Sequence, residues 1–198
     1  MSAELTFDEA LHEYRVRGAI VPSVTQVLAP LASFDGVPAQ VLEAKRDLGH
    51  RVHLACQLHD EDDLDEASVE PDVAPYLEAY RRFLADTDAR VVLNEGRVYH
   101  PTYRYAGTLD RVFLFSNAEH WLVDLKTCFT TPRAAGPQTA AYLMALTTML
   151  GNVRPTRRAA LRLRPDGTYR LDPLDRPDDW SVFLACLTLN RFKEATNG

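Results

Sequence analysis

The spacing of apolar residues changes near the middle of the chain, and this change constrains the fold more than any other feature of the sequence. Residues 38–59 and 74–86 carry apolar side chains at helical spacing, which predicts two helices. Residues 90–100, 103–115 and 120–128 are rich in β-branched and aromatic residues, which predicts three successive strands. An all-helical or all-β chain is therefore excluded.

The N-terminal segment predicts a hairpin followed by a helix. Residues 12–28 contain two short apolar runs that meet at Arg17 and Gly18, a pair suited to a turn. Ser23 stands directly before a helical pattern and is a candidate N-cap.

The C-terminal part predicts a helix, a second hairpin and a final helix. Residues 136–150 are strongly apolar and begin with a Gly-Pro pair, residues 157–164 and 168–171 form the hairpin, and residues 178–195 close the chain. The whole order predicts an α/β (α+β) fold with a central mixed β-sheet flanked by helices. The length of 198 residues fits one domain over residues 1–198.

Charge is distributed unevenly along the chain. The net charge of −6 argues at first against a nucleic-acid partner. However, eight acids fall within residues 60–72, which contain no Lys or Arg, and we expect this segment to be a solvated acidic connector. Residues 133–170 hold seven arginines and one acid, Asp166. These arginines suit either bidentate contact with phosphate or an ordinary basic surface.

The composition also indicates where such a protein works. No run of about 18 apolar residues is present, which argues against a membrane span, and the N-terminus lacks the pattern of a signal peptide. The three cysteines are far apart, which argues against a disulfide framework, a zinc knuckle or an iron–sulfur cluster. We therefore expect a cytoplasmic protein with no membrane partner.

Two acids and a lysine interrupt the apolar strands. Asp110 lies within the second strand, and Asp124 and Lys126 are two residues apart on the third, so their side chains share a face. A buried charge must be paired or must bind an ion. One interpretation is a structural Asp–Lys pair. The other is a divalent cation shared by Asp110 and Asp124, with Lys126 beside a substrate phosphate, which predicts phosphodiester hydrolysis.

Four short motifs follow one another along the chain: Gly49-x-x-x-His53, Gly107-x-x-Asp110, Asp124-Leu125-Lys126 and Gln138-x-x-x-Tyr142. In their order and in the elements expected to carry them, they resemble the PD-(D/E)XK nuclease superfamily, and more narrowly its RecB-like group, which includes many phage exonucleases. The resemblance spans residues 49–142 and implies a restriction-endonuclease-like core. An Asp stands at position 124, where Glu is commoner in that family, and the four-cysteine cluster of some relatives is absent.

The resemblance implies a role for each matched residue. Asp110 and Asp124 are expected to be catalytic acids and metal ligands, the Leu125 backbone carbonyl a further ligand, and Lys126 the catalytic lysine. His53 would complete the metal shell with a ring nitrogen, which suits Mn²⁺ better than Mg²⁺. Taken alone, His53 is better interpreted as a helix histidine satisfied by a hydrogen bond in the core. The expected cofactor is Mg²⁺ or Mn²⁺.

Other residues have expected roles at the edge of this site. Glu95 binds the metal directly, binds it through water, or is a solvated acid at a bend. Gln138 and Tyr142 are four apart on a helix, so both point the same way, and the resemblance implies contact with DNA. Thr127 and Arg133, in the loop after the lysine, are candidates for holding a phosphate.

The resemblance implies a metal-dependent deoxyribonuclease, an exonuclease acting on linear DNA ends in phage recombination or repair. A structure-specific endonuclease, an RNA-directed nuclease and an inactive DNA-binding or scaffold protein on the same fold remain alternatives. The expected partners are DNA and a single-strand annealing or helicase protein, since the chain has no P-loop of its own. A phage-encoded enzyme would work in the host cytoplasm, and the oligomeric state is open.

Overall fold

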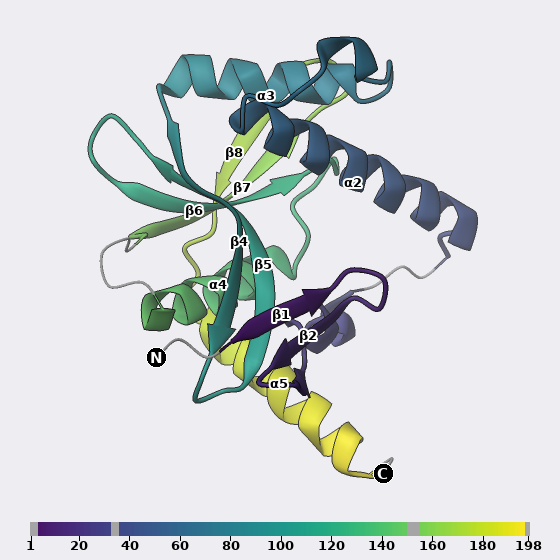
Figure 1. Cartoon of the computed structure of the whole chain (residues 1–198), viewed down its shortest axis with the longest axis vertical. Helices are drawn as coiled ribbons and strands as arrows, with labels where there is room; N and C mark the ends of the chain where they lie inside the picture. The colour runs from purple at the N-terminus through teal and green to yellow at the C-terminus, as the bar shows by residue number, and fades with distance from the viewer. Residues whose placement is uncertain (1–3, 33–35, 150–154, 197–198) are drawn as a thin grey trace.

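The computed structural model describes residues 4–32, 36–149 and 155–196. Its centre is a five-stranded sheet with the order β4-β5-β6-β7-β8 (Figure 1). The strands are β4 (Arg90–His100), β5 (Tyr105–Leu114), β6 (His120–Lys126), β7 (Arg157–Leu163) and β8 (Tyr169–Pro173). All neighbours are antiparallel except β6 and β7, which are parallel. A parallel pair needs a crossover, and the helix α4 (Ala135–Met149) lies between these two strands in the sequence.

One face of the sheet is covered by α2 (Ala39–Asp60) and α3 (Ala74–Thr87) (Figure 1). Both helices present apolar side chains at helical spacing to Phe113 of β5 and to Val123 and Leu125 of β6. The buried core on this face includes Val52, Cys56, Tyr80, Phe83, Phe113, Val123 and Leu125. Only the second half of α2 is buried in this way. Val41, expected on the apolar stripe, is 42% exposed, because the first half of the helix projects beyond the sheet.

The other face is covered by α4, by α5 (Asp179–Thr196) and by the short α1 (Val24–Val27). Since side chains alternate along a strand, Leu122 points to this face while its neighbours Val123 and Leu125 point to the first. Asp124 belongs by the same alternation to the α4 face. β6 is therefore buried on both sides from Leu122 to Leu125, and any charge placed there is enclosed by protein.

A second, three-stranded antiparallel sheet precedes α1. It consists of β1 (Leu5–Asp8), β2 (Glu13–Val16) and β3 (Ala19–Val21). The expected hairpin turn at Arg17 and Gly18 joins β2 to β3, and β1 is a strand that the sequence pattern did not reveal. Ser23 caps α1 as expected: its hydroxyl accepts from the Gln26 N–H, and its own N–H donates to Gln26 Oε1.

The α/β fold with a central mixed sheet flanked by helices is confirmed. Most elements begin and end within a few residues of the expected positions, as ordinary boundary uncertainty allows. Residues 1–3, Leu150 at the end of the expected helix, and Arg154 in the basic stretch lie outside the described residues. Within the described ranges, no helix combines the length and the apolar character that a bilayer crossing requires.

The acidic connector, residues 60–72, is exposed but tied to the helices. Arg51 of α2 pairs with Asp72 at 2.8 Å and also with Glu70, and Arg81 of α3 pairs with Glu66. Asp60 departs from the expectation of a solvated segment. It is the last residue of α2, and its side chain is buried because it pairs with Arg111 under the sheet.

Candidate metal centre

The strands β5 and β6 separate at the position of the two predicted acids. They pair from Leu114↔His120 as far as Arg111↔Val123. Beyond this position the backbone pairing of the two strands ends. The Asp110 side chain takes its place, since its Oδ2 accepts a hydrogen bond from the Leu125 N–H at 2.6 Å. The opening leaves Asp110 Oδ1 without this structural bond, and it lies 3.7 Å from His53 Nδ1.

Asp124 and Lys126 form a close buried pair, with 2.6 Å between Asp124 Oδ2 and Lys126 Nζ. The Asp124 side chain is 1% exposed, and among the described residues neither of its oxygens has a hydrogen bond of good geometry. Burial raises the pKa of Asp124, and Lys126 only partly opposes this. Burial also works against the charged Lys126, but the carboxylates of Asp124 and Asp110 outweigh it and raise the pKa of Lys126. Nζ therefore carries its proton.

His53 reaches the same opening from the buried half of α2. Its Nε2 lies 3.1 Å from the Leu125 carbonyl oxygen, a contact in which the ring N–H donates. His53 thus touches two of the other predicted ligands, Asp110 and the Leu125 carbonyl. A cation in this position would replace the proton on the ring nitrogen.

Glu95 completes the cluster from β4. One ligand atom each of His53, Glu95 and Asp110 lies within 4.8 Å of the others. The expected bend is real although β4 runs through it, because Glu95 has a φ of 45°, in the left-handed region that a side chain rarely adopts. Burial, and then repulsion by Asp110, raise the pKa of Glu95 to about 7, while Arg111 opposes the shift. We name His53, Glu95, Asp110, Asp124 and Lys126 the acidic cluster.

Arg111 donates hydrogen bonds to two residues of the acidic cluster, Glu95 and Asp110, and the sequence alone did not identify it. Its side chain is fully buried; Nε donates to Asp60 Oδ2 at 2.6 Å, and Nη1 donates to Glu95 Oε1 at 2.9 Å and to the Asp110 carbonyl at 2.8 Å. The Tyr80 hydroxyl lies 2.8 Å from Asp60 Oδ1. A basic residue next to Asp110 in an otherwise apolar strand was the available signal, but its partners lie too far along the chain to be paired by inspection.

Gln138 and Tyr142 point the same way on α4, as expected, and Gln138 Nε2 lies 3.3 Å from the Tyr142 hydroxyl. Tyr142 is only 3% exposed, so almost none of its side chain is available to touch DNA in this structure. The ring packs on Gly107, where a Cβ atom would come within 2.6 Å of Cε1. The glycine of the GxxD motif is thus explained by the close approach of this ring.

The loop after Lys126 is held to the far edge of the sheet. Thr131 Oγ1 donates to Asp172 Oδ2 at 2.5 Å, and the buried Arg162 donates to the same oxygen. Arg133 is exposed and makes no ion pair with any residue in the described ranges. By contrast, four arginines of the basic stretch pair with carboxylates: Arg157, Arg158, Arg162 and Arg170. Arg162 and Arg170 share one carboxylate, Asp172, so these pairs neutralise the basic stretch only in part.

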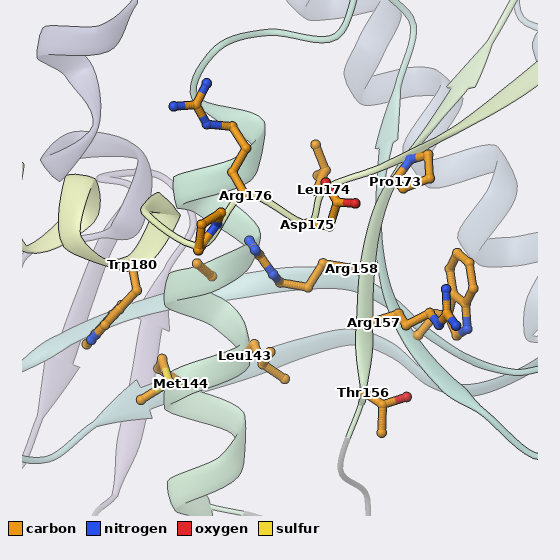
Figure 2. A pocket seen from close by; sticks show the side chains of 13 residues that line it. Leu143, Met144, Thr156, Arg157, Arg158, Pro173, Leu174, Asp175, Arg176 and Trp180 are labelled. Carbon is orange, nitrogen blue, oxygen red and sulfur yellow. The ribbon is translucent and has the colours of Figure 1, made fainter.

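Two cavities of nearly equal size compete as candidate sites. One, of about 540 Å³, has His53 and Glu95 in its wall. The other, of about 550 Å³, lies between α4, β7 and the start of α5, where Arg158 reaches from β7 toward α4 (Figure 2). Its arginines are paired: Arg157 with Glu119, Arg158 with Asp179 and Arg176 with Asp178. Size does not separate the two cavities, but the first is favoured because its wall contains His53 and Glu95, which have ligand atoms within 4.8 Å of each other and of Asp110.

No family model matches this chain, and no curated protein matches it. Among solved structures, the chain is similar to an alkaline exonuclease (LHK-Exo) from Laribacter hongkongensis, with 16% identity and a TM-score of 0.41 over 89% of this chain and 94% of that one. It is equally similar to LHK-Exo in complex with dAMP, with 16% identity and a TM-score of 0.41 over 90% and 95% of the two chains. This is a distant likeness, and the case for a function rests on the side chains of the acidic cluster.

Proposed function

We propose that the protein is a divalent-metal-dependent nuclease that hydrolyses phosphodiester bonds in DNA. One observation carries the proposal. Ligand atoms of His53, Glu95 and Asp110 lie within 4.8 Å of one another, next to the buried Asp124–Lys126 pair, in which neither Asp124 oxygen has a well-formed hydrogen bond among the described residues. Three acids gathered in this way are costly in a purely structural role, because each buried carboxylate needs compensating positive charge.

The residues present fit a divalent cation. Asp110, Asp124, Glu95 and the Leu125 carbonyl offer oxygen atoms, the ligands that Mg²⁺ and Mn²⁺ prefer, and His53 adds a nitrogen that favours Mn²⁺. The raised pKa values of Asp124 and Glu95 have the same origin, burial together with the charge of Asp110. A positive ion among these groups would remove both penalties.

When bound, such a cation polarises a phosphoryl oxygen and favours deprotonation of the attacking water. The chain supplies the rest. Lys126 keeps a protonated Nζ beside Asp124, where it can neutralise charge that develops on the phosphate. Arg111 holds the Glu95 carboxylate by a hydrogen bond from behind the cluster. Gln138, Thr127 and Arg133 are our candidates for contacts with the DNA backbone, and we assign Tyr142 the role of positioning Gln138.

We favour an exonuclease acting on linear DNA ends in phage recombination or repair, with a single-strand annealing or helicase protein as partner. This finer assignment rests on the resemblance of the four motifs to the RecB-like group. We also propose a cytoplasmic location, which is the host cytoplasm if the enzyme is phage-encoded. The three cysteines are free thiols, as is usual for proteins of a reducing compartment.

The test uses linear and closed circular duplex DNA, each with Mg²⁺ or Mn²⁺, for the wild type, for Lys126→Ala and with EDTA. Lys193→Ala, which removes an exposed lysine of α5, is the matched control. Loss of linear DNA alone, prevented by EDTA and by Lys126→Ala, supports an exonuclease. Cleavage of the circle instead indicates an endonuclease. DNA binding without cleavage under all conditions overturns the proposal in favour of a scaffold protein.

A further inference from the structure

Two carboxylates of the acidic cluster each have one oxygen in contact with a donor from β6. Asp110 Oδ2 accepts a hydrogen bond from the Leu125 N–H at 2.6 Å, and Asp124 Oδ2 lies 2.6 Å from Lys126 Nζ. An oxygen that already faces a proton donor is a weaker ligand for a cation, and the positive charge of Lys126 adds repulsion. In both Asp110 and Asp124, Oδ1 is therefore the oxygen that a metal can use.

The third carboxylate, Glu95, is restricted in the same way by Arg111. Nη1 of Arg111 donates to Glu95 Oε1 at 2.9 Å, so Oε2 is the oxygen that a metal can use. The Arg111 side chain is fully buried, and water therefore screens little of the repulsion between its charge and a cation on Oε1. Glu95 is thus the acid whose second oxygen is closed by a side chain from outside the acidic cluster.

Arg111 is fixed beside Glu95 by two further side chains. Its Nε donates to Asp60 Oδ2 at 2.6 Å, and Asp60 also accepts a hydrogen bond of 2.8 Å from the Tyr80 hydroxyl. The Asp60 side chain is 2% exposed, and a buried ion pair stays together because separation would leave two uncompensated charges. Since the guanidinium is planar, the bond at Nε also sets the direction in which Nη1 donates.

Divalent cations differ in the number of oxygens that they need. Ca²⁺ takes about six to eight oxygen ligands and often uses both oxygens of one carboxylate. Mg²⁺ is smaller and takes about six ligands, several of which are usually water. Mn²⁺ also accepts six ligands and binds the nitrogen of His53 more readily than the harder cations do. Three carboxylates that offer one oxygen each therefore suit Mn²⁺ and Mg²⁺ better than Ca²⁺.

We propose that Arg111 is a specificity-determining residue of the metal site, because it limits Glu95 to one metal-binding oxygen and so disfavours Ca²⁺ relative to Mn²⁺ and Mg²⁺. The inference rests on the proposed nuclease function and concerns the choice of cation at the same site. Arg111 acts on the cation through Glu95, so it is a positioning residue. Asp60 and Tyr80 act one step further away, since they hold the guanidinium in place.

The choice of cation is measured on the full chain without DNA, by electron paramagnetic resonance of Mn²⁺. Bound Mn²⁺ loses the sharp signal of the aqueous ion, so the concentration of Ca²⁺ or Mg²⁺ that restores half of this signal gives the relative affinity. Mn²⁺ that still binds to Asp124→Asn is assigned to other places, such as the exposed acids of residues 61–72, and is subtracted.

Arg111→Lys is the main variant. It keeps the positive charge, so the general attraction of the site for cations changes little, but one ammonium cannot reproduce the fork that joins Asp60 to Glu95. Arg158→Lys changes another buried arginine of the same sheet, paired with Asp179, and is the matched control. Arg111→Gln combined with Asp60→Asn removes two opposite buried charges together and guards against misfolding of the main variant. Far-ultraviolet circular dichroism confirms that each protein is folded.

We expect the wild type to bind Ca²⁺ roughly tenfold more weakly than Mn²⁺. Arg111→Lys and the double variant should each reduce this ratio to about threefold or less, whereas Arg158→Lys should keep it. A purely structural role for Arg111 would leave the ratio unchanged, because loss of stability does not alter the relative affinity of folded molecules for two cations. A wild type that binds Ca²⁺ as tightly as Mn²⁺, or a folded Arg111→Lys protein with the full ratio, overturns the inference.

The proposed nuclease function is judged separately from the role of Arg111. A wild type that binds no more Mn²⁺ than Asp124→Asn and does not cleave DNA rejects the nuclease function and the inference together. Wild-type cleavage with Mn²⁺, combined with an unchanged ratio in Arg111→Lys, rejects the role of Arg111 alone.

Discussion

Two groups of charged residues within the fold differ in how completely their charges are paired. Beside the cavity of Figure 2, Arg158 donates to the Gly136 carbonyl at 2.7 Å, to Thr139 Oγ1 at 3.2 Å and to Asp179 Oδ2 at 2.9 Å. A Cβ on Gly136 would come within 2.4 Å of the Asp179 carboxylate, so the arrangement is also closed sterically. In the acidic cluster, by contrast, carboxylates outnumber cations, and Asp124 lacks a well-formed hydrogen bond to any residue that the structure describes.

The difference lies in how far the charges of each group are compensated by their neighbours. Where each buried donor meets an acceptor, as around Arg158, the network contributes to stability and needs nothing more. Where acceptors are in excess, the fold carries a cost that a bound cation can remove. We infer that the acidic cluster is built for a ligand and that the Arg158 group is built for the fold. Four predictions test this comparison.

The largest effect is expected for the lysine of the acidic cluster. Lys126→Ala should lower kcat for DNA cleavage by roughly 10³-fold, because it removes the positive charge closest to the reacting phosphate. Single-turnover cleavage of end-labelled DNA measures this loss. Lys193→Ala should retain wild-type activity. A Lys126→Ala protein with more than about a tenth of that activity would contradict the assignment.

The Arg158 group should give a large effect on stability instead. Arg158→Met leaves a mostly buried Asp179 carboxylate unpaired, and should lower the free energy of unfolding by about 3 kcal/mol. For a chain of this length, Tm falls by roughly 6–12 °C. Arg157→Met, whose side chain is 58% exposed, should cost at most about 1 kcal/mol.

Thermal unfolding followed by circular dichroism gives both values, and cleavage per folded molecule should be normal in both variants. Loss of activity in folded Arg158→Met at low temperature would show that the two groups are not independent.

Metal should stabilise only the protein with an intact acidic cluster. At about one hundred times its Kd, Mg²⁺ or Mn²⁺ should add about 2.7 kcal/mol to the free energy of unfolding of the wild type, and EDTA should reverse the gain. Asp124→Asn removes a buried ligand and should abolish most of this shift, whereas Asp179→Asn should leave it intact. Thermal melts of both variants with and without metal measure the change in Tm. An equal change in Asp124→Asn and Asp179→Asn would show that Asp124 is not a metal ligand.

The smallest effect is a pH dependence of the metal-free protein. The pKa of Glu95 is about 7 in the folded chain against an ordinary value of 4.5, so the folded state binds the proton more tightly. This contribution to stability is therefore full below pH 4.5 and is lost as the pH rises to about 7. We expect about 1 kcal/mol, because Glu95 keeps 27% of its side chain exposed. Urea titrations at several pH values should show that the free energy of unfolding depends less on pH in Glu95→Gln than in the wild type. The same pH dependence in both proteins would contradict the raised pKa of Glu95.

Much of the acidic cluster could be expected from the sequence because strand and helix periods are local. The alternation of β6 predicts that Asp124 and Lys126 share a face, and the structure brings them within 2.6 Å. Helical spacing predicts the helix α2 that carries His53, although not that only its second half is buried. Their roles as ligand and catalytic residue remain predictions.

The remaining features depend on contacts between distant segments. Arg111 meets Asp60 from 51 residues away, and no local pattern links the two. The burial of Tyr142 follows from the absence of a side chain at Gly107 on a different element. The cavity beside His53 and Glu95 is bounded by residues of the N-terminal sheet, which is joined to β5 by the hydrogen bond between Tyr14 and Thr108. Each of these depends on tertiary packing, which periodicity does not report.

The parallel pairing of β6 with β7 has a consequence for synthesis of the chain. His53 and Leu125 are 72 residues apart, and β6 is left with an open edge until β7 has been made. Contacts of such long range form late in folding. A ribosome must therefore release residues 157–163 before β6, the strand that carries Asp124 and Lys126, gains its second neighbour.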